Sequence, residues 1–186
     1  MPALGEFFLV VAAVLLGILV ISYISAVLVP QENFAMSQQR AINLASSSTI
    51  AVGPLMVDPV NRVASAVFEF YNPGVSTNLT VIVFQVNSSL VSSVGQLVPN
   101  SLPAYIVYLP SGSNASVVKI DTPIYDLSGR VLLNGTYKVY TVPANVPFTV
   151  KVYGVSSNQV LVIWFLWYTG GYWFRVSYSF TGVPPS

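Results

Sequence analysis

A run of 23 residues without a charged side chain, from Phe7 to Val29, constrains this chain more than any other feature. Its clearly polar side chains are Ser22, Tyr23 and Ser25. As an α-helix the run would extend about 35 Å, which matches the ~30 Å hydrocarbon core of a bilayer. Because the run is apolar around its whole circumference, such a helix needs lipid or protein on every side.

Three kinds of segment have this composition. A cleavable secretory signal is disfavoured, because the run is longer than a signal's apolar region and no Lys or Arg precedes it. A permanent single-span membrane anchor fits the length, but the first basic residue is Arg40, which leaves its orientation poorly specified. In the third interpretation a basic leader has been removed, and the helix moves from the membrane into a protein assembly.

Glu6 stands directly before the apolar run. A carboxylate at the edge of a buried apolar helix needs a counter-charge or a raised pKa. Before Arg40, about 50 Å further along a helix, the only cation is the Met1 α-amino group. We therefore expect Glu6 to pair with that amine, its own or a neighbouring copy's, and a neighbour's amine would set the axial register between subunits. The alternative is a solvated carboxylate, which a helix N-terminus favours by about 0.3–1 kcal/mol.

Small residues recur at a four-residue spacing within the run. Ala13 and Gly17 form one pair, and Ser22 and Ala26 form another. Lipid tails are about as apolar as leucine, so helices that associate in or from a membrane depend on close packing. The two pairs predict places where helix backbones approach one another.

Pro30 follows the apolar run and predicts a kink or a break, because proline lacks an amide hydrogen and disfavours helical geometry at the preceding residue. Residues 31–48 then predict an amphipathic stem that rests one face on a globular head. "SSST" at 46–49 predicts the end of this stem. Its apolar stripe consists of Phe34, Ala41, Ile42 and Ala45.

These N-terminal features resemble the type IV pilin superfamily, specifically the archaeal pilins. The resemblance is carried by Glu6, by the apolar helix that starts beside it, and by "SAVLVPQENF", which places a proline inside the long N-terminal helix. It covers residues 1–48, and Glu6 lies one residue further from the first residue than is usual in the family. The resemblance implies a leader removed by prepilin peptidase, insertion in the cytoplasmic membrane, and polymerisation by the pilus assembly machinery.

Residues 49–186 predict a single all-β head. Their apolar and polar residues alternate with period two in runs rich in β-branched and aromatic residues, spaced as in a sandwich. We predict an α+β chain in which a long apolar helix precedes an immunoglobulin-like β-sandwich, and the resemblance implies the same. The runs are "SAVFEFY", "LTVIVFQV", "AYIVYL", "SVVKI", "TYKVYTV", "FTVKVYG", "QVLVIWFLWY" and "YWFRVSYSF".

Turn residues separate these runs, at 72–74, 110–114 and 156–158 among other places. Asn134-Gly135 and Gly170-Gly171 suit two-residue hairpins that need positive φ. We expect a tight hairpin at each of these two dipeptides.

The last predicted hairpin is apolar on both faces of its first strand, "VLVIWFLWY". Such a strand is covered on both sides by its own domain or contacts another subunit. The first is our default, and the second makes Trp164, Trp167 and Trp173 candidates for an intersubunit aromatic surface. Stacking on a sugar is a third interpretation.

The composition argues against catalysis. The chain contains no Cys and no His, so thiolate and imidazole chemistry is absent, and no nucleotide-binding or nucleophile motif occurs. We expect no enzyme activity, no cofactor and no metal site; Asp121 and Asp126 could bind calcium only weakly. With 7% charged residues and a net charge of +1, the chain lacks the basic surface that nucleic acids require.

Asn-x-Ser/Thr acceptors occur at four places near predicted turns or strand ends: Asn78, Asn87, Asn114 and Asn134. Together with a surface of Ser, Thr and Asn, they predict a glycosylated outer face. The leading interpretation of the whole chain is a pilin, the structural subunit of an extracellular archaeal filament, and the resemblance implies that the filament attaches cells to surfaces or to other cells. The alternative is a membrane-anchored extracellular β-domain, such as a surface-layer accessory or a solute-binding module.

Overall fold

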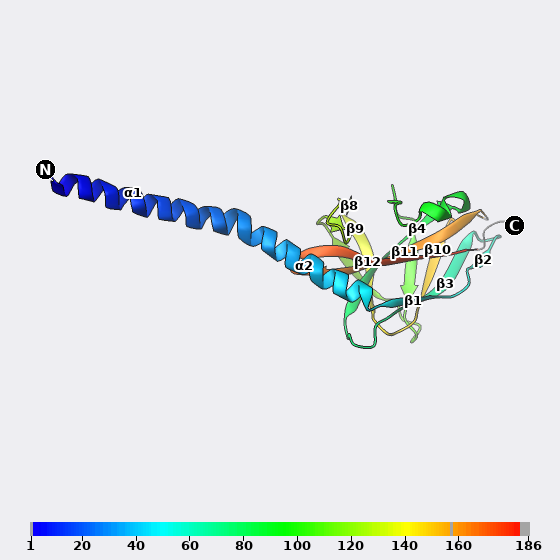
Figure 1. Cartoon of the computed structure of the whole chain (residues 1–186). Coiled ribbons are helices and arrows are strands. Elements are labelled where there is room, and N and C mark those ends of the chain that lie inside the picture. Colours follow the sequence, from blue (N-terminus) through cyan, green and yellow to red (C-terminus); the bar gives the residue numbers. More distant parts are fainter. Residues whose placement is uncertain (1, 157, 183–186) are drawn as a thin grey trace.

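A helical rod leads into a β-rich head in the computed structural model, which describes residues 2–156 and 158–182 (Figure 1). The rod consists of α1 (Pro2–Tyr23), a π-helical segment η1 (Ile24–Leu28) and α2 (Val29–Ser46) in direct succession. The N-terminal end of the rod points away from the head, whereas α2 lies along the head. The predicted end of the stem at the serine cluster is confirmed.

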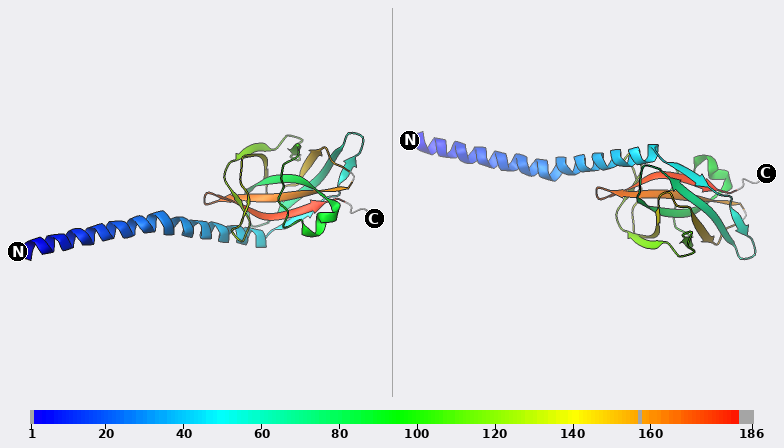
Figure 2. Two further views of the ribbon diagram at one scale, coloured as in Figure 1. Left: turned by 90° about the horizontal axis from the view of Figure 1, so that it is seen from above. Right: turned by 90° about the horizontal axis from the view of Figure 1, so that it is seen from below.

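Of the kink or break predicted at Pro30, the break does not occur, because the helix continues through this residue. Val29 keeps helical angles, with φ −60° and ψ −45°, and its amide donates to the Ile24 carbonyl, the i→i−5 bond of a π-helix. The widened turn directly before Pro30 accommodates a residue that has no amide hydrogen to donate. The rod bends gently where α1 gives way to α2 (Figure 2).

All eight predicted runs form strands. The long ones are β3 (Val63–Tyr71), β4 (Asn78–Asn87), β9 (Tyr137–Pro143), β10 (Phe148–Tyr153), β11 (Gln159–Thr169) and β12 (Tyr172–Thr181). The shorter ones are β5 (Tyr105–Tyr108) and β6 (Ser116–Ile120). Four strands of two to four residues escaped prediction, because two to four residues are too few to show alternation: β1 (Thr49–Val52), β2 (Met56–Asp58), β7 (Ile124–Tyr125) and β8 (Val131–Leu133). A 3₁₀ segment, η2 (Ser88–Ser93), follows β4.

The strands form two sheets packed as a β-sandwich, so the predicted α+β class with a sandwich head is confirmed. The five-stranded sheet has the order β1-β3-β10-β5, and β2 pairs with β3 further along the same strand. The seven-stranded sheet has the order β6-β9-β4-β11-β12-β7-β8, and its β12–β7 pair is parallel.

The seven-stranded sheet curls around a core of its own. β8 and β9 lie far apart in the strand order, yet residues 134–136 alone connect them, a span of at most about 14 Å. The sheet must therefore bend until β8 approaches β9. Asn134-Gly135 forms part of this connection, so the hairpin predicted there is wrong: β8 pairs with β7.

Two apolar cores result, and β11 separates them. Leu161, Ile163 and Phe165 face the core between the two sheets, which also contains Ala41 and Leu44 of α2. The opposite face of β11 contributes to the second core, inside the curled sheet, through Val160, Val162, Trp164 and Leu166. A strand placed between two cores must be apolar on both faces, which explains the sequence of β11 without a partner subunit.

The predicted hairpin at Gly170-Gly171 is confirmed. It joins β11 to β12, and both glycines have positive φ, 59° and 92°. A Cβ at Gly170 would also overlap the Ser37 hydroxyl of α2. The hairpin therefore needs glycine for its backbone angles and for the close approach of the stem.

Candidate assembly surface

The surface of α1 is apolar and exposed on every side. Fourteen large apolar side chains between Leu4 and Ile24 are exposed, and so is Tyr23, each with at least 37% of its surface accessible. The helix is long and apolar enough to cross a membrane. Full burial of one such side chain is worth about 1.5–3 kcal/mol, so this surface requires lipid or protein around it.

The predicted polar and small-residue features of α1 have different outcomes. Glu6 is exposed on the first turns of the helix. Its pairing with the Met1 amine stays a prediction, because Met1 lies outside the described residues. Ala13 and Gly17 lie one above the other on regular α-helix, and a Cβ at Gly17 would meet no atom within 4 Å. This face is open to a close neighbour.

The second small-residue pair crosses the boundary between two helical segments. Ser22 lies at the end of α1, whereas Ala26 lies inside the π-helical segment. A four-residue step brings side chains to nearly the same side of the axis in an α-helix and in a π-helix. Both residues are exposed, and their packing against a neighbouring helix stays a prediction.

The stem is anchored on the head by an aromatic cluster. The Phe34 ring lies 5.0 Å from the rings of Tyr125 and Tyr172 and 5.5 Å from that of Phe174, measured between centroids. Two of these contacts have edge-to-face geometry, which is favourable for aromatic pairs. Further along α2, Ala41 and Leu44 enter the core between the sheets. Head and stem are therefore one packed unit.

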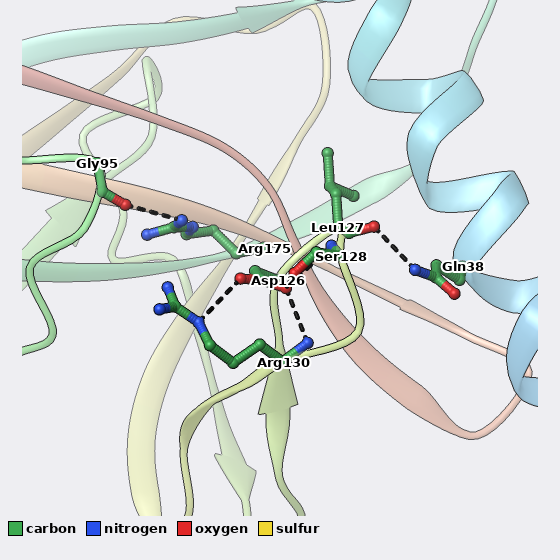
Figure 3. Close-up of polar contacts among 7 residues, drawn as sticks. All are labelled: Gln38, Gly95, Asp126, Leu127, Ser128, Arg130 and Arg175. Carbon is green, nitrogen blue, oxygen red and sulfur yellow. Dashed lines mark hydrogen bonds and ion pairs between the residues drawn. The ribbon is translucent and has the colours of Figure 1, made fainter.

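Hydrogen bonds reinforce this joint at two levels. Gln38 Nε2 donates to the Leu127 carbonyl over 2.9 Å, as Figure 3 shows. Directly after α2, the side-chain amide of the buried Asn72 donates from Nδ2 to the hydroxyls of Ser47 and Ser48, over 2.9 and 3.1 Å. The stripe predicted for the stem included Phe34 and Ala41 but missed Leu44 and Ser37, both of which are buried.

The loop that receives Gln38 is held in shape by Asp126. Its carboxylate accepts hydrogen bonds from the Ser128 amide and from Arg130, whose Nε lies 3.2 Å away (Figure 3). Burial acts to raise the pKa of Asp126, but the hydrogen bonds from Ser128 and Arg130 and the charge of Arg130 hold it below its usual value. Asp126 thus shapes its own turn. No group of three or more metal-ligating side chains occurs among residues 2–156 and 158–182.

Replacing Phe34 by alanine tests the joint. We expect the free energy of unfolding to fall by about 2–3 kcal/mol, less than the roughly 3–5 kcal/mol of a Phe-to-Ala change in a core, because Phe34 is only half-buried. Denaturant unfolding of the full chain in detergent micelles measures the change. Met36→Ala is the matched control, since Met36 is 52% exposed on the same helix and its loss should cost no more than about 0.5 kcal/mol. Equal effects of the two substitutions would contradict a packed joint.

The three tryptophans do not form one exposed surface. Trp164 has no accessible surface, so its assignment to an intersubunit contact is wrong. Trp167 is half-buried, and its Nε1 donates to the Thr77 hydroxyl over 3.2 Å. Trp173 is half-buried beside Tyr168, with ring centroids 4.9 Å apart. The default prediction, that this hairpin packs within its own domain, holds for both faces of β11.

The four predicted glycosylation acceptors are all exposed, but their surroundings differ. Thr80, the hydroxyl residue of the Asn78 sequon, is buried inside β4. Asn87 caps η2 by accepting a hydrogen bond from the Ser89 amide. Asn114 and Asn134 have an exposed hydroxyl residue two positions later. The last two are therefore the most accessible acceptors in the folded head.

No known protein family, curated protein or solved structure matches this chain.

Proposed function

We propose that this chain is a pilin, the structural subunit of an extracellular archaeal filament. The observation that carries the proposal is the exposed apolar rod of α1, which projects from a head that already has two closed cores (Figure 1). Before assembly the rod lies in the cytoplasmic membrane. In the filament, copies of the rod cover one another as a central bundle, and the heads form the outer layer.

The packed joint between stem and head supports this proposal. A filament requires that the position of the helical bundle determine the position of each head. Phe34, Gln38 and Ala41 supply that link by contacts from three successive turns of α2. The resemblance to archaeal pilins adds prepilin peptidase and the assembly machinery as expected partners, and attachment to surfaces or cells as the expected role.

A single-span membrane anchor carrying an extracellular β-domain is the second candidate, because the length of α1 suits a bilayer. The two functions differ in what detergent-free shearing releases from cells. A pilin gives filaments whose helical reconstruction shows a core of α1 helices. An anchored protein gives no polymer and stays with the membrane until detergent is added. That second result would overturn our proposal.

We also propose that the heads are glycosylated. Peptide mass spectrometry of native material should find the highest occupancy at Asn114 and Asn134 and the lowest at Asn78, whose sequon hydroxyl is buried after folding. Asn→Gln substitution at each site should remove the corresponding mass increment. Unmodified peptides at all four sites would contradict this proposal.

A further inference from the structure

One end of the seven-stranded sheet is left uncovered by the five-stranded sheet. Val117 and Lys119 of β6 lie opposite Tyr140 and Lys138 of β9 in the antiparallel register, so the four side chains share one face. Val117 is 58% exposed. On this face Tyr140 packs against Tyr105 of β5, at the border of the core between the two sheets.

A groove runs between this face and the segment that leads into β5. Its volume is about 520 Å³, which is within the range of small-molecule sites. The floor is rigid, because the Tyr105 hydroxyl donates to the Val81 carbonyl over 3.0 Å, and burial raises the pKa of this tyrosine so that it stays neutral. The lining is Leu102, Pro103, Ala104, Tyr105, Val117, Thr136, Tyr137, Lys138 and Tyr140.

The positive charge beside the groove is only partly compensated. Lys119 and Lys138 lie directly opposite each other, and like charges in this arrangement destabilise a sheet. Lys119 contacts Asp121 at 4.0 Å, with both side chains more than 60% exposed, and within the described residues no salt bridge forms at Lys138. In a chain with only seven basic residues, a pair of facing lysines beside a groove that Tyr140 lines favours an anionic ligand.

We propose that this groove binds an acidic polysaccharide. Carboxylates of uronate units contact the Lys119 and Lys138 ammonium groups, while the apolar face of a sugar ring lies on Tyr140. Thr136 supplies a hydroxyl for the ring oxygens. The ligand gives a target to the adhesive role proposed above, but the site belongs to the head of a single chain and does not depend on polymerisation.

The test uses the full chain in detergent micelles, carrying Asn134→Gln so that a glycan on the neighbouring residue cannot fill the groove. Calorimetric titration with tetragalacturonate should show binding that weakens with added salt. Maltotetraose, which is neutral, should bind more weakly. The double variant Lys119→Gln/Lys138→Gln should lose roughly threefold to thirtyfold in affinity, as expected for two exposed ion pairs.

The matched control is Lys151→Gln, which removes a lysine on β10 of the other sheet and should leave the affinity unchanged. Melting temperatures of both variants should equal or exceed that of the parent, which separates loss of binding from loss of fold. Three results would overturn the proposal: no binding of tetragalacturonate, equal binding by the double variant, or equal binding of a tetraglutamate peptide. Each can occur whether or not filaments form, so failure here leaves the pilin proposal to its own test.

Discussion

Replacing Leu16 with arginine should abolish filaments and strongly reduce membrane insertion. Leu16 lies in the middle of α1, and 64% of its surface is exposed in the single chain. Insertion of an arginine at the centre of a membrane helix costs about 2.5–3.5 kcal/mol. In a helical bundle the same charge would be buried among apolar side chains, and the described part of α1 offers no acid except Glu6, near its start. Flotation of membranes and electron microscopy of sheared material measure the two effects.

The control places the same charge on the stem. Gln39 is exposed on α2, where its amide contacts Asn43, and Gln39→Arg should leave both insertion and filament yield near the parent level. Wild-type filament yield from the Leu16→Arg variant would show that α1 does not form the filament core. Loss of insertion without any filament in the parent strain would instead favour the anchored β-domain.

The local sequence pattern was sufficient to predict the helix and most strands, but not to predict which strands pair. The eight predicted runs are rich in β-branched and aromatic residues, so their strands could be predicted, and Gly170-Gly171 has the positive φ angles that a two-residue hairpin requires. Asn134-Gly135 has equally good turn chemistry, but it connects strands that pair with other partners. Which strands pair depends on how the sheet curls, and that depends on long-range burial of residues such as Ile120 and Leu133.

The candidate assembly surface was also predictable only in part. The exposed apolar surface of α1 could be predicted directly, because a helix that is apolar on all sides needs lipid or protein around it. The joint between stem and head was predicted in part, because Phe34 and Ala41 belong to the apolar stripe. Ser37 is polar, and it is buried only because Gly170 lets the hairpin approach α2. The π-turn that lets the helix continue through Pro30 could not be predicted, since it has no sequence signature.

Removing Trp164 should unfold the head rather than disturb contacts between subunits. Trp164→Ala should lower the free energy of unfolding by about 3–5 kcal/mol, the cost of a large cavity in a core. Trp164 has no accessible surface and contacts the Phe84 ring edge-to-face at 5.3 Å. The Arg175 guanidinium lies over the Trp164 ring, 4.8 Å from the ring centroid. Removing the ring would therefore also remove a cation–π contact that stabilises the Arg175 charge. Denaturant unfolding of the full chain in micelles measures the loss.

Phe165→Ala is the informative partner of this substitution, because the neighbouring residue on β11 faces the other core. If the curled sheet encloses a true second core, both variants should be destabilised by similar amounts. Tyr168→Ala, on the same strand but 55% exposed, should cost less than about 1 kcal/mol. A Trp164→Ala head with unchanged stability and impaired assembly would contradict the second core. The apolar second face of β11 would then belong to an interface between copies.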